Sequence, residues 1–120
     1  MTTPTRFMED ILSMWTNADA EARSAVQRAR FTEDIRFQNQ QGEFVGYAGL
    51  DRFRASMRDR FPNARFSLIG APETIGDGFR AFWRYGPPEK PEMVTGMDFV
   101  IWDGERAKVL YAFVNPPTGG

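Results

Sequence analysis

Asp98 is the residue of this sequence whose surroundings point most clearly to chemistry. It lies in the apolar segment VTGMDFVIW, where strand alternation puts it on one face with Val94, Gly96, Val100 and Trp102. Ionising a carboxyl group among such neighbours is costly, so we expect the pKa of Asp98 to rise and the protonated group to be available as a hydrogen-bond or proton donor at neutral pH. Asp98 is therefore a candidate general acid. The alternative is a structural carboxyl whose hydrogen bonds are satisfied within the fold.

Asn39 and Trp15 are two further candidates for contacts with a substrate. Asn39 shares a predicted strand face with Ile35 and Phe37, where its amide could orient a substrate oxygen or satisfy backbone groups at the strand end. Trp15 ends the apolar stripe of a predicted helix, so it is either part of the core or a source of an indole N–H at the site.

The residue types that are missing limit the possible reactions. With no Cys and no His, the chain has no thiolate nucleophile, no Ser-His-Asp triad and no zinc-finger spacing. No cluster of carboxylates has metal-ligand spacing, and we expect neither a metal nor another cofactor. Carboxylates, hydroxyls and amides must carry out any chemistry.

The charge balance argues against a nucleic-acid partner. Fifteen basic and sixteen acidic residues give a net charge of -1, without the basic excess that phosphate backbones require. The arginines of one segment are interleaved with Asp51 and Asp59, which is typical of a solvated helix face: Arg52, Arg54, Arg58 and Arg60.

Three helices are predicted in the first half of the chain. Thr3 and Pro4 form a helix start, and the apolar stripe that follows predicts a helix over residues 4–17. A second helix with smaller apolar residues follows a cap at Asn17 or Asp19. Its expected inner face consists of Ala22, Ala25, Val26 and Ala29. After Gly46, apolar residues at helical spacing predict a third helix that Pro62 ends: Leu50, Phe53, Met57 and Phe61.

Strand patterns dominate the rest of the sequence. A short strand over residues 35–39 precedes the third helix, and four apolar segments follow it: ARFSLIG, GFRAFWRYG, EMVTGMDFVIW and RAKVLYAFVN. Asp103-Gly104 predicts a hairpin between the last two. This order predicts a single α+β domain over residues 1–120, with three N-terminal helices on a curved antiparallel sheet and a flexible tail at 116–120. No apolar stretch approaches the roughly 18 residues of a membrane span and no signal pattern is present, so we expect a soluble, cytoplasmic protein.

The segment GFRAFWRYG admits two registers. Alternation predicts that Trp83 and Tyr85 face inward and that Arg80 and Arg84 face outward. Phe82 shares the arginine side, so the reversed register, which would turn two guanidinium groups toward an anionic ligand, stays the alternative.

The last two strands are apolar on both faces, which a one-sided sheet does not require. The outer face of these strands is expected to hold Met97, Phe99, Ile101, Tyr111 and Phe113. Because a large exposed apolar area is unfavourable on a monomer, we expect a homodimer through this outer sheet face.

The order and spacing of five motifs resemble the SnoaL-like branch of the nuclear transport factor 2-like superfamily. The motifs are WTNADAEAR, FTEDIRFQNQQGEFVGYAGLDRF, RFPNARF, FRAFWRYGPP and TGMDFVIWDG, and the resemblance covers residues 7–115. It implies a cone-shaped domain with an internal apolar pocket. Because this fold hosts isomerases, cyclases, hydratases, epoxide hydrolases and binding proteins, it does not by itself imply one reaction.

The resemblance also suggests roles for individual residues. Asp98 matches the acid that ketosteroid isomerase keeps neutral in an apolar site. Trp15 stands where that isomerase has a tyrosine donor, and Asn39 stands where it has its aspartate base. Asn39 also resembles the water-positioning asparagine of limonene epoxide hydrolase-like proteins. The last strand reads VLYAFVN and lacks the carboxylate of the cyclases and epoxide hydrolases, so none of these mechanisms transfers intact.

The sequence therefore predicts a protein that binds a small, largely apolar molecule. Catalytic roles are expected for Asp98, Asn39 and Trp15. The expected ligand-binding residues are Phe37, Phe53, Met57, Trp83, Tyr85, Val100, Leu110, Ala112 and Val114. Three alternatives stay open: a cofactor-independent isomerase, cyclase or hydratase/hydrolase of a hydrophobic substrate, a non-catalytic binder of a small ligand, and a protein-interaction domain.

Overall fold

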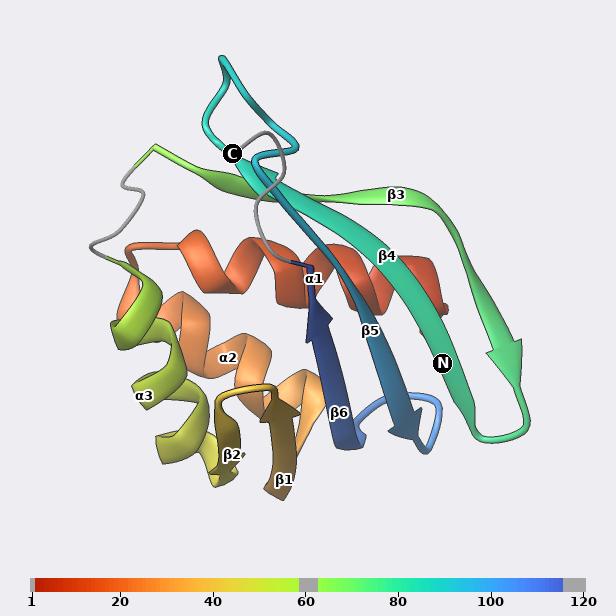
Figure 1. Ribbon diagram of the computed structural model, residues 1–120. Helices are drawn as coiled ribbons and strands as arrows, with labels where there is room; N and C mark the ends of the chain where they lie inside the picture. Colours follow the sequence, from red (N-terminus) through yellow and green to blue (C-terminus); the bar gives the residue numbers. More distant parts are fainter. Residues whose placement is uncertain (1, 59–62, 116–120) are drawn as a thin grey trace.

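The computed structural model describes residues 2–58 and 63–115 (Figure 1). Within them lie α1 (Pro4–Thr16), α2 (Ala20–Arg30), α3 (Gly46–Arg58), β1 (Phe31–Asn39), β2 (Gly42–Val45), β3 (Arg65–Ile75), β4 (Gly78–Gly86), β5 (Val94–Trp102) and β6 (Ala107–Val114). The predicted helix end at Phe61 and Pro62, the charged residues Asp59 and Arg60, the side chain of Arg58 and the predicted tail at 116–120 lie outside the described residues.

Side-chain caps fix the starts of the first two helices. Thr3 Oγ1 accepts a hydrogen bond from the backbone N–H of Arg6 at 3.1 Å, and Asp19 Oδ1 accepts one from that of Glu21 at 3.0 Å. Each cap satisfies a backbone donor that the helix itself leaves free, so Asp19 rather than Asn17 is the cap of α2.

The inner face predicted for α2 is partly wrong. Ala25 and Ala29 are exposed, whereas Gln27 is buried. Gln27 Nε2 donates to Asp51 Oδ1 of α3 at 2.7 Å. Because this hydrogen bond satisfies its polar group, a glutamine occupies a position for which the sequence pattern favours an alanine.

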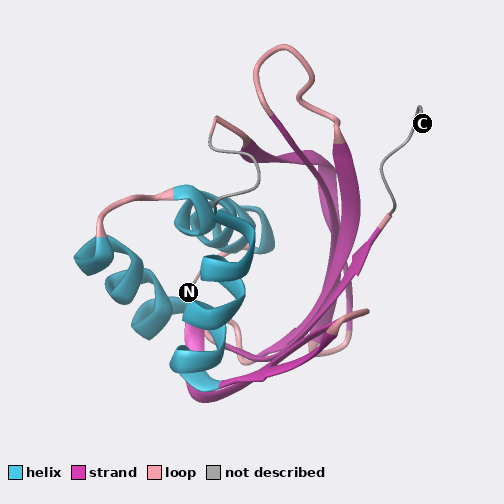
Figure 2. Ribbon diagram, turned by 60° about the vertical axis from the view of Figure 1, so that its left-hand side comes forward, coloured by secondary structure: helices cyan, strands magenta, loops and turns pink. Residues whose placement is uncertain are grey.

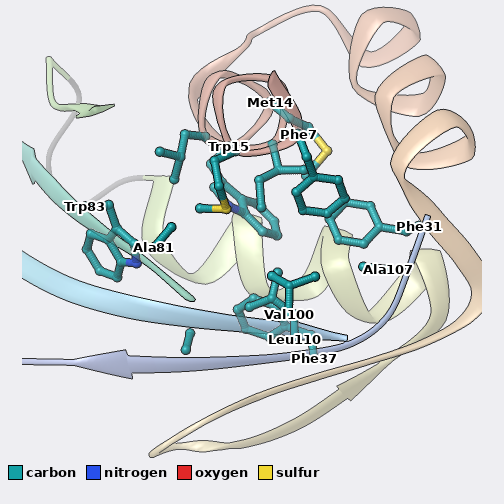
Figure 3. Packing of buried hydrophobic residues seen from close by; sticks show 14 of the residues in the cluster. Phe7, Met14, Trp15, Phe31, Phe37, Ala81, Trp83, Val100, Ala107 and Leu110 are labelled. Atoms are coloured by element: carbon teal, nitrogen blue, oxygen red, sulfur yellow. The ribbon is translucent and has the colours of Figure 1, made fainter. Parts of the chain in front are cut away.

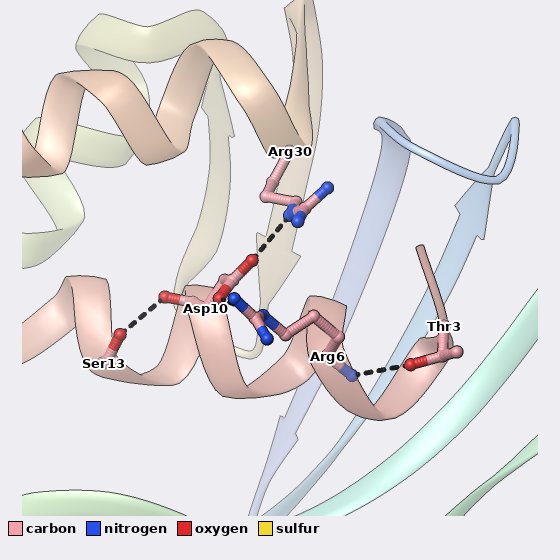
Figure 4. A network of polar contacts seen from close by, with 5 residues as sticks. All are labelled: Thr3, Arg6, Asp10, Ser13 and Arg30. Carbon is pink, nitrogen blue, oxygen red and sulfur yellow. Dashed lines mark hydrogen bonds and ion pairs between the residues drawn. The ribbon is translucent and has the colours of Figure 1, made fainter. Parts of the chain in front are cut away.

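A polar network joins α1 to α2 (Figure 4). Arg30 Nε donates to Asp10 Oδ2 at 2.8 Å, and Arg6 Nε lies 3.4 Å from Asp10 Oδ1. Ser13 Oγ donates to the carbonyl of Asp10 at 2.9 Å. Asp10 thus connects the two helices through its carboxylate.

Six strands form one sheet in the order β2-β1-β6-β5-β4-β3. All neighbouring pairs are antiparallel except β1 and β6, which pair in parallel. The expectation of a curved, mainly antiparallel sheet is therefore confirmed, with this one exception. The strand β2 was not predicted, and β1 begins at Phe31 rather than at Ile35.

The core lies between the helices and the concave face of the sheet (Figure 2). Phe7 of α1 packs edge-to-face on Phe31, Phe79 and Trp102, with ring centroids 5.3–6.1 Å apart. Figure 3 shows Trp15 and Phe7 of α1 above Val100 and Leu110 of the sheet. This core holds α1 across the middle of the sheet.

The register of β4 follows the first of the two predicted alternatives. Trp83 and Tyr85 are buried on the concave face, and Arg80 and Arg84 are exposed on the convex face. Phe82 also lies on the convex side and is 42% exposed. No helix in the described part of the chain is long and apolar enough to cross a membrane.

Candidate functional site

Asp98 lies on the concave face of the sheet, among short side chains. Its partners across the two neighbouring strands are Ala81 of β4 and Ala112 of β6. Only 4% of Asp98 is exposed. The predicted inward position is therefore confirmed, and small neighbours leave the carboxyl group unobstructed by bulky side chains on its own row of the sheet.

Trp83 is the hydrogen-bond partner of this carboxyl group. The indole Nε1 donates to Asp98 Oδ1 at 2.9 Å. Trp83 pairs with Gly96, and a Cβ atom at position 96 would lie 2.3 Å from Trp83 Cζ2. Gly96 therefore provides the space in which the indole lies beside Asp98, and Phe66 packs edge-to-face against the indole with ring centroids 5.3 Å apart.

Burial changes the acidity of Asp98. Desolvation raises its pKa to about 7, although the hydrogen bond from Trp83 lowers it. Oδ1 accepts the indole N–H, but no partner for Oδ2 is found among residues 2–58 and 63–115. Trp83 thus holds Oδ1 of Asp98. Oδ2 can donate a hydrogen bond to a ligand when it is protonated and accept one when it is ionised.

Trp15 lies in the aromatic part of the core, near the C-terminal end of α1. It is 5% exposed and packs edge-to-face on Phe37 and Phe53, with ring centroids 5.7 and 5.2 Å away. It makes no hydrogen bond to Asp98 in the described part of the chain. These contacts are those of a core residue, and a contact with substrate stays a prediction.

Asn39 lies at the end of β1, where its Oδ1 accepts a hydrogen bond from the backbone N–H of Gln41 at 2.8 Å. This is the backbone-satisfying role that the sequence left open as an alternative. Asn39 also lines a surface groove of about 190 Å³ together with Gln38, Gln40, Tyr111, Ala112 and Phe113. Its amide therefore has a structural role in the turn, and the residue lies at the edge of the groove.

The nine residues expected to bind a ligand all belong to the core or pack against it. Val100 and Leu110 have no exposed surface, whereas Trp83, Tyr85 and Ala112 keep 5–7%. Phe53, Met57 and Val114 are half-buried, and Phe37 is buried. A ligand that reaches Asp98 would first meet the members of this set that retain some exposure, and its contacts with the set stay predictions.

Arg54 corrects the interpretation of the arginine-rich segment as a solvated face. Its side chain is buried, and its guanidinium group donates to the carbonyls of Trp15 at 3.2 Å and Asn17 at 3.0 Å. Arg54 thereby connects α3 to the C-terminal end of α1. Its position four residues after the fully buried Leu50 places it on the apolar helix face, a signal that could have identified it.

The described residues include no group of three or more carboxylates, cysteines or histidines that could hold a metal ion. The polar groups available for chemistry among the candidate residues are one buried carboxyl group, an indole donor and an amide.

Comparison with solved structures identifies the fold. A candidate isomerase of the SnoaL-like family from Agrobacterium tumefaciens superposes with a TM-score of 0.81 and 25% identity, covering 92% of this chain and 96% of that one. A candidate SnoaL-like polyketide cyclase from Jannaschia gives 0.69 and 16%, covering 96% and 90%. A protein with a ketosteroid isomerase-like fold from Catenulispora acidiphila, solved with trimethylamine, gives 0.71 and 18%, covering 92% and 85%.

The chain therefore has the nuclear transport factor 2-like fold and resembles its SnoaL-like and ketosteroid isomerase-like members, as the sequence motifs indicated. Comparison with models of known families gives no match, and comparison with curated proteins gives none either. The structural neighbours support a general role in isomerase-like or cyclase-like chemistry or in ligand binding.

Proposed function

We propose that this protein binds a small, largely apolar molecule on the concave face of the sheet and that Asp98 holds an oxygen atom of that molecule. The observation that carries the proposal is the carboxyl group itself: it is 4% exposed, and in the described chain only its Oδ1 has a partner. No buried side-chain oxygen or nitrogen of the described residues lacks a hydrogen-bond partner, which supports an Oδ2 that keeps some accessible surface through which a ligand can reach it.

The charge state of Asp98 decides which ligands fit. With a pKa of about 7, roughly half of the carboxyl groups are protonated at neutral pH, and the protonated form can donate to a neutral carbonyl, ether or hydroxyl oxygen. An anionic ligand would meet a carboxylate at higher pH. A neutral, mainly apolar molecule with an oxygen acceptor is the chemical class that suits the site.

The pH dependence of affinity tests this assignment with two probes of opposite behaviour. The neutral ketone trans-2-decalone should bind best below pH 7 and lose about three- to tenfold in affinity in all as the pH rises through 7, because only protonated Asp98 donates the hydrogen bond. Trimethylamine, which the Catenulispora protein binds, should show the reverse trend because its cation pairs with the carboxylate. Calorimetric titrations between pH 5.5 and 8.5 would measure both.

Variants at Asp98 provide the second arm of the test. Asp98→Leu fills the volume without a polar atom and should weaken ketone binding about three- to tenfold, the range of one neutral hydrogen bond. Asp98→Asn keeps a donor and should retain binding while its pH dependence disappears. Ketone binding that is equal in wild type and Asp98→Leu at every pH would contradict the proposal.

Acid catalysis is a second candidate function, favoured by the same pKa of about 7, because a group that titrates at neutral pH can exchange protons during turnover. The reaction class would be isomerase-like or cyclase-like, with Asp98 donating a hydrogen bond to a developing oxyanion. Exchange of the α-protons of 2-decalone in deuterated water, in which solvent takes up the proton as the enolate forms and returns a deuteron, measures this by NMR. Because asparagine keeps a hydrogen-bond donor, Asp98→Leu is the comparison, and exchange that wild type does not accelerate relative to Asp98→Leu would leave binding as the function.

A further inference from the structure

The ladder between β1 and β6 is short and parallel. Among the pairs that the described strands form, it is the parallel one, and parallel pairing is slightly less stable per residue than antiparallel pairing. Its register shifts between Phe31 and Arg36, so its regular part joins residues 36–38 of β1 to residues 109–111 of β6. Few backbone hydrogen bonds therefore hold these two strands together.

A side chain continues the connection where this ladder ends. Gln40 lies in the turn after β1, where its Nε2 donates to the carbonyl of Val114 at 2.8 Å and its Oε1 accepts from the N–H of Val114 at 3.1 Å. The groove of about 190 Å³ lies between this contact and the last backbone pair, Gln38 and Tyr111. Because Gln40 is exposed, water competes for both of its hydrogen bonds.

The end of β6 is fixed on its other side by β5. The N–H of Asn115 donates to the carbonyl of Thr95 at 2.9 Å, and Asn115 Nδ2 donates to Thr95 Oγ1 at 3.1 Å. Within the described chain, the hydrogen bonds from the turn at Gln40 and Gln41 to β6 are those of the Gln40 side chain. The tip of the β1–β2 hairpin is therefore the part that can move away from β6.

This end of β6 lies beside the candidate site. Ala112 is the cross-strand partner of Asp98, and Val114 is that of Gly96, over which the indole of Trp83 lies. Asp98 is 4% exposed, so a molecule the size of a bicyclic ketone reaches it only if part of the surrounding wall moves. The hairpin tip is a neighbouring segment that one exposed side chain holds in place.

We propose that the tip of the β1–β2 hairpin swings away from β6 and back, and that Gln40 is the latch that closes it. The opening breaks two neutral hydrogen bonds, which requires far less free energy than unfolding the sheet. In the open state a ligand enters or leaves between the hairpin tip and Ala112. Passage of a ligand rests on the proposed function, whereas the opening is a property of the sheet itself.

Amide hydrogen exchange at several low urea concentrations measures the opening in the wild-type chain. The N–H of Val114, whose acceptor is Gln40 Oε1, should exchange through a local opening at a rate that hardly depends on urea. Amides at the centres of β5 and β6 should exchange through global unfolding, at rates that rise steeply with urea. The same urea dependence at Val114 and at these central amides would mean that the hairpin tip does not open separately.

Gln40→Leu is the variant that releases the latch, since leucine makes neither hydrogen bond. The association and dissociation rates of trans-2-decalone, measured by NMR exchange spectroscopy, should both rise about five- to hundredfold, the range for two neutral hydrogen bonds. The Kd should not change, because a gate alters both rates alike, whereas damage to the site would change the Kd. Gln41→Leu, at an exposed position in the same turn, is the matched control and should leave both rates unchanged.

A readout without the ketone separates the latch from the proposed function. TEMPOL, a neutral cyclic nitroxide, broadens the NMR signals of nearby protons, and its effect on the methyl signal of Ala112 should increase in Gln40→Leu but not in Gln41→Leu. Equal broadening, or equal ketone rates, in wild type and Gln40→Leu would overturn the latch while binding through Asp98 still stands. If the ketone does not bind at any pH, the proposed function fails, and the urea and TEMPOL experiments decide the latch by themselves.

Discussion

Trp83 and Asp98 are the pair of residues on which the candidate site depends. The indole N–H fixes one carboxyl oxygen and favours the ionised form, while burial favours the protonated form more strongly. The two effects together place the pKa near neutrality. Because two opposing effects set the pKa of Asp98, gain or loss of a single hydrogen bond changes that pKa. A titration of the carboxyl group therefore detects changes in its hydrogen-bond partners.

Removing the indole N–H should therefore raise the pKa of Asp98 further. Trp83→Phe keeps an aromatic ring over Gly96 but loses the donor to Oδ1. A carboxyl-carbon NMR titration of Asp98 measures the change. Trp102→Phe is the matched control, since Trp102 packs on Phe7 and Phe79 and makes no contact with Asp98. Equal titration curves for wild type and Trp83→Phe would contradict the hydrogen bond.

Asp98 should also make the folded state less stable at high pH. Its pKa is about 7 in the folded chain against an ordinary value of 3.8, so between these values the unfolded chain releases the proton first and stability falls as pH rises. The loss is about 1.4 kcal/mol per pH unit and about 4 kcal/mol in all, as an upper estimate. Below about pH 4 Asp98 is protonated in both states, and this loss of stability is absent.

Asp98→Asn removes this titration. Urea unfolding from pH 5 to pH 8.5 should show the variant gaining stability relative to wild type up to about pH 7, with a constant difference above it. A difference that does not change with pH would mean that Asp98 titrates alike in both states.

The burial of Asp98 could be predicted from its sequence, but its partner could not. Alternation along one strand was enough to place Asp98 on the face of Gly96 and Val100. The contact with Trp83 depends on which residue lies opposite Gly96 in the neighbouring strand. That register is set by the whole sheet, and a lone glycine in a strand gives only a hint of a close approach there.

At the scale of elements, Arg54 connects α3 to the end of α1. The last carbonyls of a helix have no partners within it, and here a guanidinium group from another helix donates to two carbonyls in this region. The contact fixes the C-terminal turn of α1 beside the aromatic cluster of Trp15. The position of that indole over the sheet thus depends on a residue in the third helix.

Arg54→Met should destabilise the protein by about 1–3 kcal/mol, since it keeps the aliphatic volume but removes the charged donor from the carbonyl of Trp15, whereas the carbonyl of Asn17 keeps a donor in Arg23. Arg52→Met provides the comparison. Arg52 is exposed, with its guanidinium 5.9 Å from the Phe44 ring centre, and its loss should change stability by no more than about 0.5 kcal/mol. Thermal and urea unfolding measure both, and equal effects would contradict the role assigned to Arg54.

Helices and strands could be predicted where the repeat of apolar residues extended over enough positions. The stripe from Phe7 to Trp15 defined α1 to within one residue of its end. The four residues of β2 are too few for a period to emerge, and their strand form depends on pairing with β1. Gln27 of α2 escaped prediction for a related reason, because its burial requires Asp51 of another helix.

At the scale of the whole molecule, the convex face of the sheet carries an apolar row across four strands. Ile69, Phe82, Met97 and Phe113 are successive cross-strand partners on β3, β4, β5 and β6. Ile69, Phe82 and Phe113 are 42–53% exposed. Tyr111 and Phe99 form a second apolar pair beside this row.

We propose that this row is the centre of a homodimer interface, because a row of aligned apolar side chains can pack against a second copy of itself. Light scattering at about 50 μM should give the mass of a dimer, which a single Phe113→Glu change reduces to that of a monomer. Ile75→Glu is the control: Ile75 is 78% exposed but lies at the end of β3, away from the row. A monomeric wild type would contradict the proposal.

The parallel pairing of β1 with β6 has a consequence for synthesis on the ribosome. Phe31 pairs with Ala107, so 76 residues must be added after Phe31 before its partner exists. At about 5–20 residues per second, this interval lasts about 4–15 s. During it, β1 and β2 can form only a two-stranded hairpin with an open edge, which is marginally stable in water and can pair with other chains. A nascent chain of this protein should therefore associate with chaperones until its last strand emerges, and only then can the sheet become continuous.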